Sequence, residues 1–130
     1  MIVFDALAEV DLFLHKERAG WVAQVLGTVD EAHAPELIYP EVVAVVRRWT
    51  LRGWLSDEVG ERAVADLADL ALVRHRHGAL RRRAWELRNR FSAYDACYIA
   101  LAETLAAQLL TSDLRLRRAA DGLVDVVTTP

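Results

Sequence analysis

The chain has 130 residues, 54% of them hydrophobic and 27% charged, and its 16 Lys and Arg against 19 Asp and Glu give a net charge of −3. This balance excludes a disordered or fibrous chain, and the length suits a single domain over residues 1–130. The single Cys excludes an internal disulfide framework and fits a reducing cytoplasm. The first residues do not form a secretory signal, and no run approaches the ~20 apolar residues of a membrane span.

The first half of the chain alternates short apolar runs with helical patterns. Residues 2–4 are apolar and end at Asp5, which predicts a buried first strand. Residues 33–35 predict a brief edge strand, because Pro35 restricts its predecessor to extended conformations. A further strand is expected over 72–75. The spacing of apolar residues predicts helices over 6–14, 19–26, 40–52 and 57–70, with Pro40 in a first turn and Ser56 as an N-cap.

The second half continues this alternation. It is expected to contain a basic helix over 79–91, an Ala-rich helix over 96–107 entered through residues 92–95, a strand over 108–111, a short helix over 114–120 and a final strand over 124–127. Strands that alternate with helices predict an α/β fold, in which helices flank a mostly parallel sheet of about four to five short strands.

Four acidic residues lie where such a fold places its ligands. Asp5 and Asp113 each follow a predicted strand, and Glu41 and Asp95 each lie in the first turn of a predicted helix. Ligands of open α/β sheets gather beyond the carboxyl ends of the strands. If the four carboxylates meet there, they repel one another unless a cation joins them, and oxygen ligands suit Mg²⁺ or Mn²⁺. The chemistry implied is metal-assisted hydrolysis of a phosphodiester.

A structural role for these acids is also open at this point. Acids in the first turn of a helix commonly interact with the helix dipole or cap the helix, and Asp is frequent where strands turn. Taken singly, Glu41 and Asp95 are better explained as structural than as catalytic.

Four segments resemble the motifs of PIN-domain nucleases, in the same order along the chain. They are MIVFDA (1–6), APELIYPEV (34–42), SAYDACYIALA (92–102) and LLTSDL (109–114). The resemblance covers nearly the whole chain and is most specific in the third segment. The length is similar to that of stand-alone VapC-type toxins.

This resemblance implies a PIN-like α/β/α sandwich and a metal-dependent ribonuclease that acts as the toxin of a toxin–antitoxin pair. Asp5, Glu41, Asp95 and Asp113 match the acidic residues of the family, with Mg²⁺ or Mn²⁺ as the cofactor. The family further implies a homodimer inhibited by a VapB-type antitoxin that covers the acidic pocket. Contact with DNA is then made only through that antitoxin, and no membrane is involved.

One departure from the family pattern bears on activity. The family often has Ser or Thr two positions after the first Asp, and this chain has Leu7. Thr111 and Ser112 retain hydroxyls beside Asp113 and are expected to orient it. The alternative is a weakened PIN fold that binds its antitoxin without cleaving RNA.

The basic run over 81–90 offers a candidate RNA surface. Arg82, Arg83 and Arg90 are placed to contact RNA phosphates beside the acidic pocket. A solvated helix face in which Glu86 pairs with these arginines explains the same pattern about equally well.

Overall fold

The computed structural model describes residues 1–14 and 16–128. Five strands form one sheet: β1 (Ile2–Phe4), β2 (Ala32–Pro35), β3 (Leu72–His75), β4 (Gln108–Thr111) and β5 (Val126–Thr128). The helices are α1 (Ala6–Leu14), α2 (Lys16–Leu26), α3 (Ile38–Leu51), α4 (Asp57–Asp69), α5 (Arg81–Glu86), α6 (Ala93–Leu105) and α7 (Leu114–Ala119), with a 3₁₀ turn, η1, over His77–Ala79.

All four strand pairs are parallel, and the order across the sheet is β3-β2-β1-β4-β5. Strand β1 is therefore central, paired with β2 on one side and with β4 on the other. The carboxyl ends of these strands lie at the same edge of the sheet, from which Asp5 and Asp113 emerge. This confirms the predicted α/β fold.

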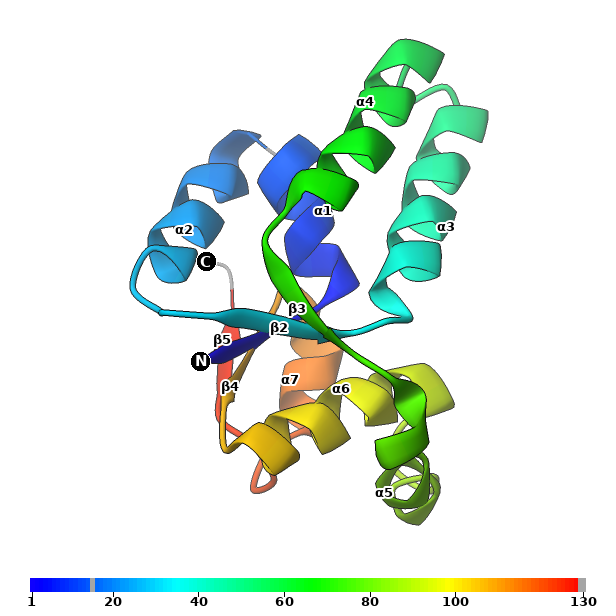
Figure 1. Ribbon diagram of the computed structural model, residues 1–130. Helices are drawn as coiled ribbons and strands as arrows, with labels where there is room; N and C mark the ends of the chain where they lie inside the picture. Colours follow the sequence, from blue (N-terminus) through cyan, green and yellow to red (C-terminus); the bar gives the residue numbers. More distant parts are fainter. Residues whose placement is uncertain (15, 129–130) are drawn as a thin grey trace.

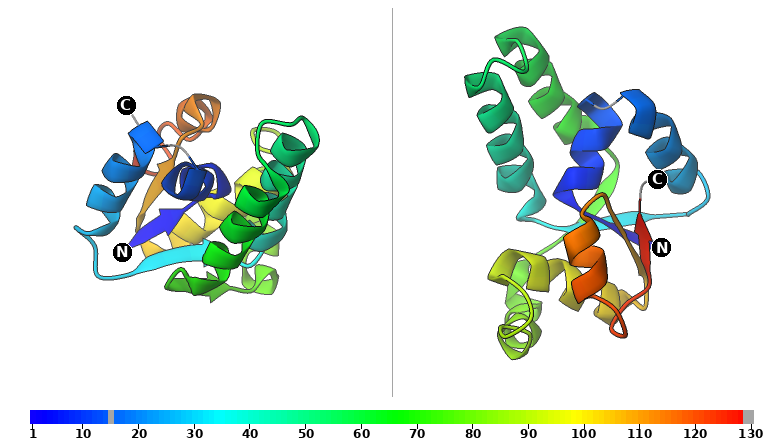
Figure 2. Two further views of the ribbon diagram at one scale, coloured as in Figure 1. Left: turned by 90° about the horizontal axis from the view of Figure 1, so that it is seen from above. Right: turned by 180° about the vertical axis from the view of Figure 1, so that it is seen from behind.

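Helices cover both faces of the sheet, and Figures 1 and 2 show the three layers. Alternation along β1 sends Val3 into one core with α6 and sends Ile2 and Phe4 into the other core with α1, α3 and α4. Leu109 and Leu110 of β4 divide between the two cores in the same way. Central strands buried on both faces are typical of parallel sheets, which explains the continuous apolar runs in the sequence.

Two elements differ from the sequence prediction. The segment predicted as an edge strand, β2, lies inside the sheet because β3 pairs along its outer side. Pro35 is tolerated there since the pairing with β1 involves only Ala32 and His33. The basic helix predicted over 79–91 is shorter, because η1 precedes it and α5 ends at Glu86.

The remaining boundaries move by a few residues. Helix α2 begins at Lys16, and β5 covers Val126–Thr128 instead of 124–127. In the part of the chain that the structure describes, no helix combines the length and the apolar character needed to cross a bilayer.

Candidate functional site

Two of the four predicted acids are helix caps. Asp5 precedes α1, and its Oδ1 accepts the Ala8 backbone N–H at 2.8 Å. Asp113 is the N-cap of α7, where its Oδ1 accepts the backbone N–H groups of Arg115 and Leu116 at 2.8 and 3.2 Å. Each cap satisfies helix donors that would otherwise lack a partner. In both residues Oδ2 takes no part in the cap and is left for contacts with other elements.

Thr111 connects these two strand ends. Its side chain is fully buried, and its hydroxyl donates a hydrogen bond to Asp5 Oδ2. The hydroxyl oxygen of Thr111 also accepts the backbone N–H of Asp113 at 3.0 Å. The last residue of β4 therefore fixes the carboxylate that follows β1 and also the turn that carries Asp113.

The other two acids approach from helix N-termini. Glu41 lies in the first turn of α3, and Asp95 lies in the first turn of α6, where Ser92 Oγ accepts the Asp95 backbone N–H at 3.1 Å. Helix N-termini carry partial positive charge, which favours carboxylates at these positions. Glu41 Oε1 is buried and has no hydrogen-bond partner among the described residues.

The electrostatics link the four acids into one cluster. Burial raises the pKa of Asp5 to about 7, and the charges of Glu41 and Asp113 add to this effect. Burial also raises the pKa of Glu41, and the Asp95 charge adds to it while the neighbouring Tyr98 hydroxyl opposes it. The pKa of Asp95 rises through burial and the charge of Asp113, against the lowering effect of Arg115. Carboxylates that raise the pKa values of their neighbours are typical of sites that bind a cation.

Arg115 provides a positive charge within this cluster. Its Nη2 lies 3.6 Å from Asp95 Oδ2 and 3.3 Å from Asp113 Oδ2. One guanidinium group therefore pairs with two acids that come from different elements. The pattern along the chain does not single out Arg115, because its partner Asp95 is 20 positions away.

Glu9 is a fifth acid, which the sequence analysis missed. It lies one helical turn after Asp5 in α1 and is fully buried, and neither of its carboxylate oxygens has a hydrogen-bond partner in the described part of the chain. Burial and the charge of Asp5 raise its pKa to about 8. The available signal was an acid at spacing four from Asp5 within an otherwise apolar helix.

The donor chemistry of the cluster fits a hard divalent cation. All of its groups are carboxylates, two of them already share the cationic Arg115, and buried carboxylate oxygens of Glu9 and Glu41 lack partners. In the arrangement described for residues 1–14 and 16–128, no three His, Cys, Asp or Glu side chains converge closely enough to enclose one ion. Binding therefore requires side-chain adjustment at the carboxylates, and the two paired with Arg115 must first release its guanidinium group.

The structure separates the two hydroxyls expected to orient Asp113. The Thr111 hydroxyl does contact Asp113, since it accepts the backbone N–H of Asp113. The Ser112 hydroxyl instead donates to Asp11, a buried acid that also pairs with Arg18 at 3.4 Å. The expectation for Ser112 was wrong because its side chain points to α1. Leu7 is partly buried and packs against the apolar core that includes residues of α1, α3 and α4.

The three arginines considered for RNA contacts behave differently from one another. Arg83 binds both carboxylate oxygens of Glu103 at 2.7 and 2.9 Å and thereby joins α5 to α6. Arg90 donates to the Asp121 carbonyl at 2.6 Å. The Arg82 side chain is 92% exposed and pairs with Glu86 at 3.5 Å. Arg83 and Arg90 are therefore engaged in holding the fold, whereas Arg82 remains accessible.

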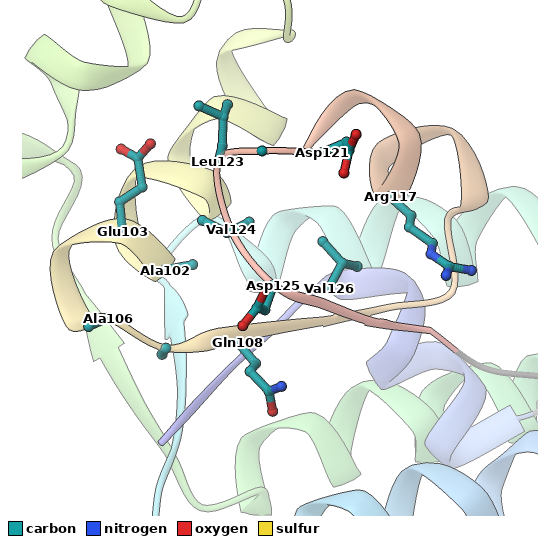
Figure 3. Close-up of a pocket in the computed structure, with 12 residues that line it drawn as sticks. Ala102, Glu103, Ala106, Gln108, Arg117, Asp121, Leu123, Val124, Asp125 and Val126 are labelled. Atoms are coloured by element: carbon teal, nitrogen blue, oxygen red, sulfur yellow. The ribbon is translucent and has the colours of Figure 1, made fainter.

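A separate hollow has none of the acids Asp5, Glu9, Glu41, Asp95 and Asp113 in its lining. Figure 3 shows its lining at the end of α6 and along the segment that leads to β5, with Glu103, Asp121 and Asp125 at its rim. Gln108, which begins β4, also lines it, so this hollow is at the amino end of the strand. Because ligands of parallel sheets bind beyond the carboxyl ends of the strands, it is a poor candidate for the functional site.

The chain is similar to known proteins along almost its full length. The family model for the PIN domain matches residues 2–122. Ribonuclease VapC9 of Mycobacterium tuberculosis is 35% identical over 130 residues, which cover 100% of this chain and 99% of that protein. Ribonuclease VapC1 of the same species is 38% identical over 122 residues, covering 93% and 91%.

Solved structures share the fold at lower identity. Mycobacterium tuberculosis VapC20, described as a Sarcin-Ricin loop cleaving toxin, superposes with a TM-score of 0.71 at 16% identity over 100% of both chains. VapBC2 from Rickettsia felis, described as bound to a DNA fragment from its promoter, gives a TM-score of 0.69 at 13% identity over 100% of both chains. A toxin–antitoxin complex from Klebsiella pneumoniae gives 0.71 at 18% identity over 98% of this chain and 97% of that one.

Proposed function

Because this chain belongs to the PIN-domain family and, within it, to the VapC ribonucleases, we propose that it is a divalent-metal-dependent endoribonuclease, the toxin of a toxin–antitoxin pair. The observation that carries the proposal is the acid cluster itself. Asp5, Glu41, Asp95 and Asp113 come from four separate segments at the carboxyl edge of the sheet, and the charges of neighbouring acids in this group raise the pKa values of Asp5, Glu41 and Asp95.

Asp5, Asp95 and Asp113 are the residues that would hold Mg²⁺ or Mn²⁺, and Glu41 would complete the pocket. When bound, such an ion supplies positive charge for the phosphate and acidifies the attacking water. The caps of α1 and α7 orient Asp5 and Asp113 through Oδ1, so that each offers Oδ2. Thr111 holds Asp5 Oδ2 in place and acts as a positioning residue.

Glu41 is the residue we assign to the attacking water. Its Oε1 is buried without a hydrogen-bond partner in residues 1–14 and 16–128, and its raised pKa makes it a better proton acceptor than an ordinary carboxylate. Attack by water on the phosphodiester, with departure of the 3′ oxygen, leaves a 5′-phosphate and a 3′-hydroxyl. Arg82 is the candidate phosphate contact that remains accessible on α5.

The partner we propose is a VapB-type antitoxin that covers the acid cluster. One structural relative is described as a toxin–antitoxin complex, and another as VapBC2 bound to a DNA fragment from its promoter. Binding of DNA by this chain would then occur only through the antitoxin. We further propose that the toxin is a homodimer, which light scattering of the purified protein would test.

Cleavage of a defined RNA by the purified chain tests the activity. Mn²⁺ should support cleavage to 5′-phosphate ends, EDTA should stop it, and Asp95→Asn should abolish it. Cleavage that survives EDTA or persists in Asp95→Asn would overturn the mechanism. Antitoxin binding without cleavage of any RNA tested would instead favour the weakened binding module suggested by Leu7.

A further inference from the structure

Arg115 lies where a cation shared by two of the acids would lie. Its Nη2 pairs with Asp95 Oδ2 and Asp113 Oδ2, yet its side chain is 79% exposed, whereas those of Asp95 and Asp113 are 24% and 21% exposed. Asp113 Oδ1 is occupied by the α7 cap. Oδ2 is therefore the oxygen of Asp113 that both Arg115 and a bound metal ion would require.

We propose that Arg115 is an internal counter-cation, which competes with the divalent ion for Asp95 and Asp113; this inference rests on the proposed function. Once the ion has displaced it, the Arg115 guanidinium group binds the RNA backbone at the mouth of the site. In the metal-free protein the guanidinium group offsets the repulsion between the two carboxylates. When an ion takes its place, the side chain swings away while its backbone N–H stays in the α7 cap.

Three properties of Arg115 fit this exchange. Ion pairs of such exposed arginines are weak, so a divalent ion can replace this one. A guanidinium group carries a planar fork of donors that matches phosphate oxygens. Its position in the first turn of α7 keeps the freed group close to the carboxylates, and therefore close to the phosphate that is to be cleaved.

Metal binding by variants of the full chain tests the first half of the proposal. Isothermal titration of the metal-free protein with Mn²⁺ should give about three- to ten-fold tighter binding for Arg115→Ala than for the wild type. Arg115→Lys keeps the charge without the fork and should lie between them. Arg118→Ala is the matched control, because Arg118 is exposed on the same helix and should not change the affinity.

Steady-state cleavage tests the second half. In Arg115→Ala the Mn²⁺ concentration for half-maximal activity should fall, while KM for RNA should rise by about three- to ten-fold and depend less on salt. Damage to the fold would raise both quantities, so shifts in opposite directions identify the exchange.

The outcomes separate this inference from the proposed function. Equal or weaker Mn²⁺ binding by Arg115→Ala would overturn the inference and leave the metal-dependent nuclease intact. An unchanged KM for RNA would overturn the assignment of the displaced group to the RNA backbone. Failure of the wild type to bind Mn²⁺ would overturn the proposed function and, with it, the inference.

Discussion

The inner acids of the cluster, Asp5 and Glu9, and the outer acids, Asp95 and Asp113, lie in different electrostatic surroundings. Asp5 and Glu9 are 5% and 0% exposed, and none of the ion pairs found among the described residues involves either of them. Asp95 and Asp113 are partly exposed and share Arg115. Buried carboxylates without a cation destabilise the fold unless they take up protons. The difference indicates that the inner acids reduce the stability of the fold, whereas Arg115 compensates part of the cost of burying Asp95.

Substitution of an inner and an outer acid should separate activity from stability. Asp5→Asn and Asp95→Asn should each lower the cleavage rate by more than the ~10–100-fold typical of losing an outer contact. Asp5→Asn should also stabilise the metal-free protein at pH 8, by on the order of 1–3 kcal/mol, because it removes a buried charge, whereas Asp95→Asn should stabilise it less, because Arg115 already opposes the rise in the pKa of Asp95. Urea unfolding in EDTA measures this, and equal stability changes in both variants would contradict the distinction between inner and outer acids.

Loss of the Thr111 hydroxyl should weaken the inner site in particular. Thr111→Val removes the donor to Asp5 Oδ2 and the acceptor of the Asp113 N–H, so Mn²⁺ affinity should fall about 10–100-fold. Thr111→Ser should restore most of the affinity. Ser112→Ala is the control, because its hydroxyl serves Asp11, and it should change Mn²⁺ binding little. A larger effect for Ser112→Ala than for Thr111→Val would show that the hydroxyl roles are reversed.

The pH dependence of stability should reveal Glu9. Its pKa is about 8 in the fold against 4.5 ordinarily, so between these values the folded state holds a proton that the unfolded state has lost. Stability should therefore fall as the pH rises through this window.

Glu9→Gln should remove part of that dependence. The variant should be more stable than the wild type by about 1–3 kcal/mol at pH 8 and nearly equal to it at pH 4.5. Thermal unfolding in EDTA across this range provides the measurement, with the exposed Glu17→Gln as the control. Identical pH profiles for Glu9→Gln and the wild type would contradict the assignment of an unpaired buried acid.

The features that the sequence could predict were local ones. Asp5 follows an apolar run, and Asp95 follows Ser92 at the spacing of a helix cap. The sequence pattern alone therefore predicts that Asp5 ends a strand and that Asp95 lies at the start of a helix. The interior place of β2 could not be predicted, since the pairing with β3 joins residues about 40 positions apart.

The same limit applies to the basic residues. Arg83 resembles a free surface arginine until its partner Glu103, 20 residues away, is placed beside it by the packing of α5 on α6. The role of Arg115 likewise becomes visible only through its ion pair with Asp95, which belongs to another helix. The number of charges along the chain thus predicts a basic segment, but only the fold distinguishes Arg83 and Arg90, which bond to distant residues, from the accessible Arg82.

Asp5 and Asp113 each cap a helix with Oδ1 and offer Oδ2 to the acid cluster, and these two roles restrict which acid each position can accept. A capping carboxylate must fold back onto the first turn of its own helix, and this suits the single methylene of aspartate. Glutamate would preserve the charge but extend beyond the N–H groups that it has to meet. At these two positions, side-chain length is as constrained as charge, whereas Glu41, which has no such duty, is free of that requirement.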